Sequence, residues 1–214
     1  MKSRQTGFTL VEIAIVLVII GLLLGGVLKG QELITQAKIK NIANDFSGIA
    51  AAFYGYQDRY RKLPGDDNGA ESRWSGTTKG DGNGVISGVF NSSRQDDEPR
   101  LFWQHLRLAG FITGDTTSQD QPNNAANGVV GVQNNAGPTG AALVGPVICS
   151  SNLLGKIAIA IDAQFDDGNP AKGGVRGFKQ TGNVSIGGNN PTGSAAATSY
   201  ADDGATLYTV CKTL

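Results

Sequence analysis

Apolar residues are distributed unevenly along the chain. Residues 8–28 are almost all apolar and hold a single charged side chain, Glu12. An α-helix rises about 1.5 Å per residue and a bilayer core is about 30 Å thick, so this run is long enough to span a membrane as a helix. Residues 1–7 are polar and carry Lys2 and Arg4, which predicts that the N-terminus stays on the cytoplasmic side.

Beyond Lys29 the apolar residues take up helical spacing. Residues three and four positions apart form a stripe on one face: Ile39, Ile42, Phe46, Ile49, Phe53, Tyr56, Tyr60 and Leu63. Pro64 ends the pattern, because the residue before a proline disfavours helical geometry. We therefore expect one helix over about 8–62. Such a stripe also suits a two-chain coiled coil, but its aromatic residues fit packing on a sheet better.

The remaining residues, 64–214, predict short elements separated by loops rich in Gly, Asn and Ser. Residues 98–110 favour a short helix with Pro99 in its first turn. Residues 151–165 fit a strand or a helix, and we favour a helix capped by Ser151. Residues 113–145 indicate loop, with a short possible strand around 129–132. Further strands are expected at 175–179, 183–186 and 207–212.

Together these patterns predict an α+β protein. The long N-terminal α-helix packs its second half on a small antiparallel sheet domain with long loops and one or two short helices.

Composition narrows the classes of function. Lys+Arg and Asp+Glu are both 18, so net charge indicates no polyanionic partner. Arg59, Arg61 and Lys62 lie among tyrosines, which can bind single-stranded nucleic acid, but cations at a helix C-terminus also complement its dipole. We favour the dipole interpretation and expect no nucleic-acid partner. His105, the only histidine, lies on an apolar helix face without a second catalytic group, so we expect a core residue and no enzyme.

Glu12 is the feature that the membrane-spanning pattern leaves unexplained. A carboxylate in a spanning helix costs about 2.5–3.5 kcal/mol on insertion scales, and we find no partner for it in the segment. A cleaved secretory signal would have a shorter apolar core, and a plain anchor would not need the carboxylate. The sequence GFTLVE at residues 7–12 closely resembles the processing site of type IV pilins and of the pseudopilins of type II secretion.

That resemblance implies a sequence of maturation steps. A prepilin peptidase that is also a methylase would cut between Gly7 and Phe8 and methylate the new amine of Phe8. Glu12 would pair with the Phe8 amine of a neighbouring subunit, which supplies the missing cation. An inner-membrane assembly platform and its ATPase are the further partners implied. The precursor would lie in the inner membrane, and the product would be a homo-oligomeric helical filament in the periplasm or outside the cell.

The same resemblance divides the chain into four parts. These are a leader at 1–7, a transmembrane and assembly half of the helix at 8–30, an amphipathic half at 31–63, and a globular periplasmic or extracellular domain at 64–214. Many pilins carry a proline in the first half of the helix, and the helix locally unravels near it in the filament. This chain has none there, so any unravelling would depend on Gly21, Gly25, Gly26 and Gly30.

The implied function is that of a structural subunit of a type IV pilus-like filament. Two alternatives within the family remain open: a type II secretion pseudopilin, and a minor pilin that primes assembly or takes part in DNA uptake. A third alternative from another class is a membrane-tethered, calcium-dependent adhesin.

Two glycine-flanked stretches after the helix are rich in oxygen ligands. One contains Asp66 and Asp67, and the other contains Asp81 and Asn83. Oxygen atoms of Asp and Asn are the ligands that calcium prefers, although the same residues also form ordinary turns. Neither stretch completes the twelve-residue EF-hand pattern. Some pseudopilins bind calcium in a loop after the helix, so we carry calcium as a possible cofactor held by these four residues.

Cys149 and Cys211 are the two cysteines of the chain. Beyond the membrane they would meet an oxidising compartment, although two buried free thiols are the alternative. Many type IV pilins have a disulfide that joins a late strand to the C-terminal tail. The resemblance therefore implies a Cys149–Cys211 disulfide.

Overall fold

The computed structural model describes residues 9–140 and 142–214. Helix α1 runs over Leu10–Tyr60, close to the predicted helix, and is continuous through the glycines of its first half. The chain divides into two compact units within this helix, Met1–Ala37 and Lys38–Leu214. The two units are described separately below.

Residues 38–60 of α1 form one wall of the core of the second unit. The predicted stripe is buried at Ile42, Phe46, Ile49, Phe53 and Tyr56. The outer members of the stripe are partly buried against the same core: Ile39, Tyr60 and Leu63. Burying a large apolar side chain contributes roughly 1.5–3 kcal/mol, so this face holds the helix on the domain. The predicted packing is confirmed.

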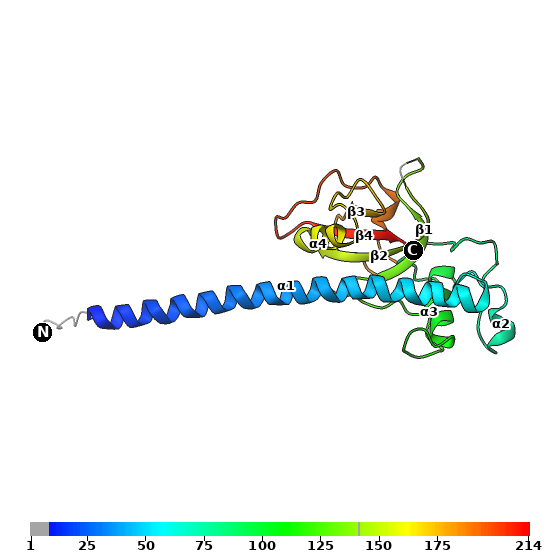
Figure 1. Ribbon diagram of the computed structural model, residues 1–214, viewed down its shortest axis with the longest axis horizontal. Helices are drawn as coiled ribbons and strands as arrows, with labels where there is room; N and C mark the ends of the chain where they lie inside the picture. The colour runs from blue at the N-terminus through cyan, green and yellow to red at the C-terminus, as the bar shows by residue number, and fades with distance from the viewer. Residues whose placement is uncertain (1–8, 141) are drawn as a thin grey trace, which may run out of the picture. The chain divides into compact units, whose positions relative to one another are not determined.

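The second unit contains a four-stranded antiparallel sheet (Figure 1). Its strands are β1 (Val130–Ala136), β2 (Leu143–Leu154), β3 (Val175–Lys179) and β4 (Leu207–Thr213). They lie in the order β1-β2-β4-β3, so the last strand in the sequence occupies the interior of the sheet. Alternate side chains of a strand point to opposite faces. Ile148 and Val210 accordingly pack with α1, whereas Val147 and Cys211 belong to a second apolar cluster with Phe90 and Phe178.

Short helices complete the second unit. They are α2 (Ala70–Arg73), α3 (Glu98–Leu108), α4 (Gly155–Phe165) and the single 3-10 turn η1 (Pro191–Gly193). Helix α3 confirms the prediction for 98–110: Pro99 lies in its first turn, and Gly110 follows its end with a φ of 76°, a conformation that favours glycine. Phe102 of α3 stacks on Phe53 of α1, with ring centroids 6.4 Å apart.

Two predicted elements were wrong in part. Residues 151–154 continue β2 and are not helix, and most of β2 lies in a segment where no strand was expected. Polar residues obscure its alternation: Asn152 has a φ of 60°, and the pairing with β4 shifts register between Ser150 and Leu153. Residues 183–186 form no strand, because Val184 bonds the side chain of Asn152, through its N–H at 2.8 Å, and not a neighbouring strand.

Candidate functional site

The first unit presents an apolar helix surface. The most apolar 18-residue window of α1 has a mean hydropathy of 2.8, and none of that window is buried. Large apolar side chains from Leu10 to Leu28 are exposed, with Leu22 at 72%. Exposed apolar surface on this scale marks contact with lipid or with other chains. Among the described residues, α1 is the helix long and apolar enough to cross a membrane.

Four glycines in the first unit's part of this helix lie on an open surface. Apart from their chain neighbours and the adjacent backbone of the helix itself, no atom of the described residues comes within 4 Å of the position that a Cβ would occupy at Gly21, Gly25, Gly26 or Gly30. Glycine weakens a helix by about 1 kcal/mol relative to alanine, and nothing within the described chain requires it at these positions. Small residues of this spacing allow close approach of a second helix.

Glu12 has a partner that the sequence analysis overlooked. Its Oε2 accepts the backbone N–H of Thr9 at 2.8 Å and the Thr9 hydroxyl at 2.7 Å. In return, the Glu12 N–H donates to Thr9 Oγ1 at 3.3 Å. This reciprocal arrangement is a capping box, whose T-x-x-E signature is visible in the sequence. The expectation that the segment supplies no partner for Glu12 was therefore wrong. The uncharged cap residue Thr9 donates hydrogen bonds to one of the two carboxylate oxygens.

The predicted processing residues Gly7 and Phe8 lie outside the described residues. Residues 2–28 match the family described as the prokaryotic N-terminal methylation motif. This motif is the signature of type IV pilins and pseudopilins, and the chain carries it over these residues. No curated protein matches the chain at the threshold applied.

The predicted disulfide is present. Cys149 of β2 and Cys211 of β4 are directly paired across the two strands, and their sulfur atoms are bonded. The bridge joins residues 62 positions apart in sequence and lies in the apolar cluster on the sheet face away from α1.

Of the four residues predicted to hold calcium, Asp67 stands apart from the carboxylates that the structure groups together. Asp67 is buried on its own, where it accepts hydrogen bonds from the Tyr56 hydroxyl at 2.6 Å and from the Gly69 N–H, and forms an ion pair with Arg73. Asn83 lies beside Asp66 and Asp81: its backbone N–H donates to Asp66 Oδ1 at 2.9 Å and its Nδ2 donates to Asp81 Oδ2 at 2.8 Å, while its own Oδ1 accepts the Val85 N–H at 2.8 Å. Both residues thus have structural roles in the turns that follow α1.

Asp66 and Asp81 do come together, and Glu98 joins them. One carboxylate oxygen from each lies within 4.8 Å of the others. Asp66 accepts the N–H groups of Gly82 at 2.7 Å and Gly84 at 2.8 Å, and Glu98 accepts that of Asp81 at 3.1 Å. Burial raises the pKa of the Asp66 and Glu98 carboxyls. Glu98 was missed because it belongs to α3, away in sequence from both glycine-flanked stretches.

A second acidic group combines a residue in the last turn of α4 with two residues expected to stop that helix. It comprises Asp162, Asp166 and Asp167. Asp162 accepts the Tyr200 hydroxyl at 2.7 Å, and Asp166 accepts the Gly174 N–H at 2.6 Å. These bonds join the end of α4 to the segment before β3, at Gly174, and to the loop before β4, at Tyr200.

Proposed function

We propose that this protein is a structural subunit of a type IV pilus-like filament, processed after Gly7, methylated at Phe8 and polymerised through the first half of α1. The observation that carries the proposal is the methylation motif on the same helix as an exposed apolar surface with Glu12 near its start. The apolar surface serves first as a membrane anchor and then as the contact between subunits. The function is structural, and we infer no catalytic role for the chain.

The geometry of Glu12 is compatible with pairing between subunits. Both donors of Thr9 bond to Oε2, and no described residue donates to Oε1. A carboxylate has about four lone-pair sites, so the Phe8 amine of a neighbour could bind Oε1 while the cap stays intact. Assembly would then add a charge-assisted bond without breaking the helix start.

Two tests together decide this proposal. Intact-mass measurement and N-terminal sequencing of membrane-extracted protein should give a chain that begins at methylated Phe8. Electron microscopy of cells with and without the gene should show surface filaments only when it is present. A chain that begins at Met1, or one cut beyond Glu12, would contradict the proposal. Correct processing without surface filaments would favour the pseudopilin alternative, whose filament remains in the periplasm.

Calcium binding is a second candidate function, and we propose it at Asp66, Asp81 and Glu98. What favours it is the grouping of three carboxylates, none of which forms an ion pair with a described residue. Like charges at this spacing repel, and a divalent cation would relieve the repulsion. The backbone N–H groups that orient Asp66 leave room for further ligation by the remaining lone pairs.

The calcium proposal predicts a stability difference. A ligand that binds only the folded state stabilises by about 2.7 kcal/mol at a hundredfold excess over Kd. The full chain should therefore melt at a higher temperature in calcium than in chelator. Asp81→Ala and Glu98→Gln should abolish the difference, whereas Asp202→Asn, on an exposed loop, should retain it. Equal melting temperatures of the wild type in both solutions would leave these residues as turn formers.

A further inference from the structure

A polar pocket of about 450 Å³ lies beside α3. It is bounded by α3, by residues 76–78 and 95–96, and by the loop 117–120. Apart from Gly76, every lining residue has a polar side chain: Thr78, Gln95, Asp96, Arg100, Gln104, Thr117, Ser118, Gln119 and Asp120. An apolar ligand would bury these groups without hydrogen bonds, so the pocket fits a polar one.

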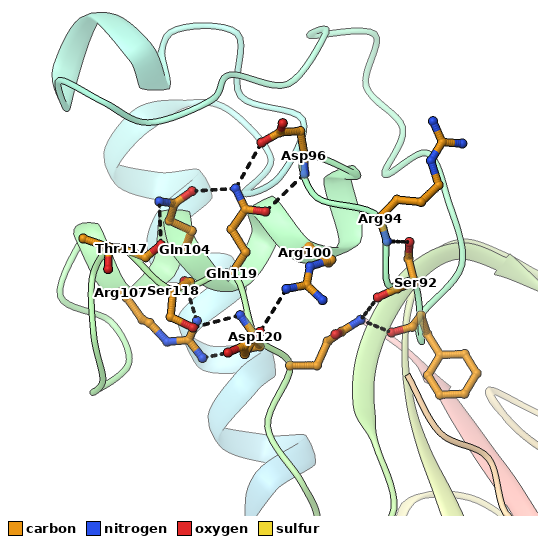
Figure 2. Close-up of polar contacts among 12 residues, drawn as sticks. Ser92, Arg94, Asp96, Arg100, Gln104, Arg107, Thr117, Ser118, Gln119 and Asp120 are labelled. Atoms are coloured by element: carbon orange, nitrogen blue, oxygen red, sulfur yellow. Dashed lines mark hydrogen bonds and ion pairs between the residues drawn. The ribbon is translucent and has the colours of Figure 1, made fainter. Parts of the chain in front are cut away.

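Hydrogen bonds hold the walls of this pocket in place. Gln119 joins two of them: its Nε2 donates to Asp96 Oδ1 at 3.2 Å and to Gln104 Oε1 at 3.3 Å, and its Oε1 accepts the Asp96 N–H at 3.1 Å. Arg107 fixes the loop by donating to the carbonyls of Ser118 at 2.8 Å and Asp120 at 2.6 Å (Figure 2). A site ordered before binding loses little entropy when a ligand enters.

Among the lining residues, Arg100 carries a buried side-chain donor that has no partner among the described residues. Its side chain is only 10% exposed, yet its single ion pair is to Asp120, at 2.9 Å. The donor without a partner is its Nε. A guanidinium carries five N–H donors, and leaving them unpaired in a buried position is costly. Asp120 and Asp96, which also line the pocket, are exposed carboxylates that each offer acceptor capacity.

We propose that this pocket binds a neutral saccharide. An anion would be repelled, because the lining residues hold two carboxylates and one guanidinium. A cation could pair with Asp96 but would leave the donors of Arg100 unused. A hydroxyl group both donates and accepts, so neighbouring hydroxyls of a sugar can donate to the carboxylates and accept from Arg100. The volume lies within the range of about 300–1,000 Å³ that is usual for small-ligand sites.

Saturation-transfer NMR on the mature full chain tests this proposal. The protein is held in dodecylphosphocholine micelles, because a sugar-based detergent would compete. Glucose, galactose, mannose and N-acetylglucosamine are the probes, with glucuronate and spermidine as charged comparators. We expect transfer to at least one neutral sugar. In Asp120→Asn the Kd should rise at least about tenfold, since hydrogen bonds to charged groups contribute about 1.5–3 kcal/mol.

Two further variants keep the result interpretable. Thr117→Trp places a large side chain at the exposed rim of the pocket and should abolish transfer without disturbing the Arg100 ion pair. Asp202→Asn is the control: this residue lies outside the pocket, and the variant should bind sugar as the wild type does. No transfer to any neutral sugar overturns the proposal. Unchanged binding in Thr117→Trp overturns the site, and stronger transfer to glucuronate or spermidine overturns the ligand class. The proposal is independent of filament assembly, which could stand if sugar binding failed.

Discussion

At the scale of single residues, His105 links the turn after α1 to the loop before α3. Its Nδ1 accepts the Gly65 N–H at 3.0 Å, so the proton must reside on Nε2, which lies 3.0 Å from the Thr78 carbonyl and donates to it. The side chain is fully buried, and this burial lowers the pKa of the imidazole to about 4. The histidine is therefore a neutral structural residue, as the sequence analysis expected.

This pKa predicts a loss of stability in acid. The unfolded chain binds a proton on His105 near pH 6.5 and the folded chain only near pH 4, so the free energy of unfolding falls as pH drops through that window. The expected loss between pH 7 and 4.5 is roughly 2–3 kcal/mol. Denaturant unfolding of the wild type and His105→Gln at both pH values measures it. The raised pKa values of Asp66 and Glu98 act in the opposite direction, but they cancel in the comparison.

The His105→Gln variant should be less stable at pH 7, and its deficit should shrink at pH 4.5. If the variant and the wild type differed by the same free energy of unfolding at both pH values, the pKa of His105 would not be lowered in the folded chain.

Glu12 provides the second prediction at this scale. Glu12→Ala should leave membrane insertion and N-terminal methylation intact, because the apolar run is retained and a membrane carboxylate is costly. Filament yield should fall strongly, since the neighbour's amine would have no partner. Glu32→Ala is the matched control: it removes a carboxylate from the same helix that forms an exposed ion pair with Lys29 at 2.7 Å. Electron microscopy and intact mass report the two outcomes.

Thr9→Val separates the cap from the charge. It removes the hydroxyl that bonds Glu12 and should weaken the helix start by about 1 kcal/mol, while the carboxylate remains available for assembly. Normal filament yield from Glu12→Ala would exclude the proposed pairing. If Thr9→Val lost filaments and Glu12→Ala did not, the helix cap would be the feature that filament assembly requires.

At the scale of elements, the disulfide fastens the two interior strands of the sheet. It closes a loop between residues 62 positions apart, which corresponds to about 4 kcal/mol in the chain-entropy model. The double variant Cys149→Ala/Cys211→Ala should lose stability of that order. Chemical denaturation of the variant measures the loss, and peptide mapping without reductant should recover the linked pair from wild-type protein. Free thiols at both positions in exported protein would contradict this expectation.

Periodicity explains which elements could be predicted. The stripe from Ile39 to Leu63 is regular over many turns, and it predicted α1 and its buried face. Strand β2 escaped prediction because its register shift and the positive φ of Asn152 break the period of two. The acidic group was predicted in part, because sequence proximity identifies Asp66 and Asp81 but not Glu98, which tertiary folding brings to them. The capping box at Thr9 could have been predicted, because its T-x-x-E motif is visible in the sequence.

At the scale of the whole molecule, the two compact units differ in how far their apolar side chains are buried within the chain itself. The described residues of the first unit expose apolar side chains throughout, whereas the second unit holds two closed apolar clusters. Every member of the larger cluster from α1 lies at Ile39 or beyond, so the second unit contains its complete core. The exposed apolar side chains of the first unit are stable only in contact with lipid or with neighbouring chains. The apolar clusters of the second unit are already buried, so its surface can face water.

This division predicts the behaviour of fragments. A fragment that begins at Lys38 should fold as a soluble monomer, because it keeps residues 38–60 of α1. A fragment that begins at Leu63 should not fold, since it loses Ile42, Phe46, Phe53 and Tyr56 from the core. Each of these burials contributes roughly 1.5–3 kcal/mol against a total stability of about 5–15 kcal/mol. Circular dichroism and size-exclusion chromatography distinguish the cases. A folded fragment without α1 residues would disprove the assignment of this core.

The interior position of β4 has a consequence for the order in which the domain can form. Strands β2 and β3 both pair with β4, and neither pairs with the other. In the export that we propose, residues 207–213 would be among the last to cross the membrane, and until they did, β3 would have no strand partner and Cys149 no Cys211 to oxidise with. Strands β1 and β2 could pair earlier, because their pairing does not involve β4. The sheet would be completed and covalently locked only after β4 arrived, which would tie folding to the completion of export.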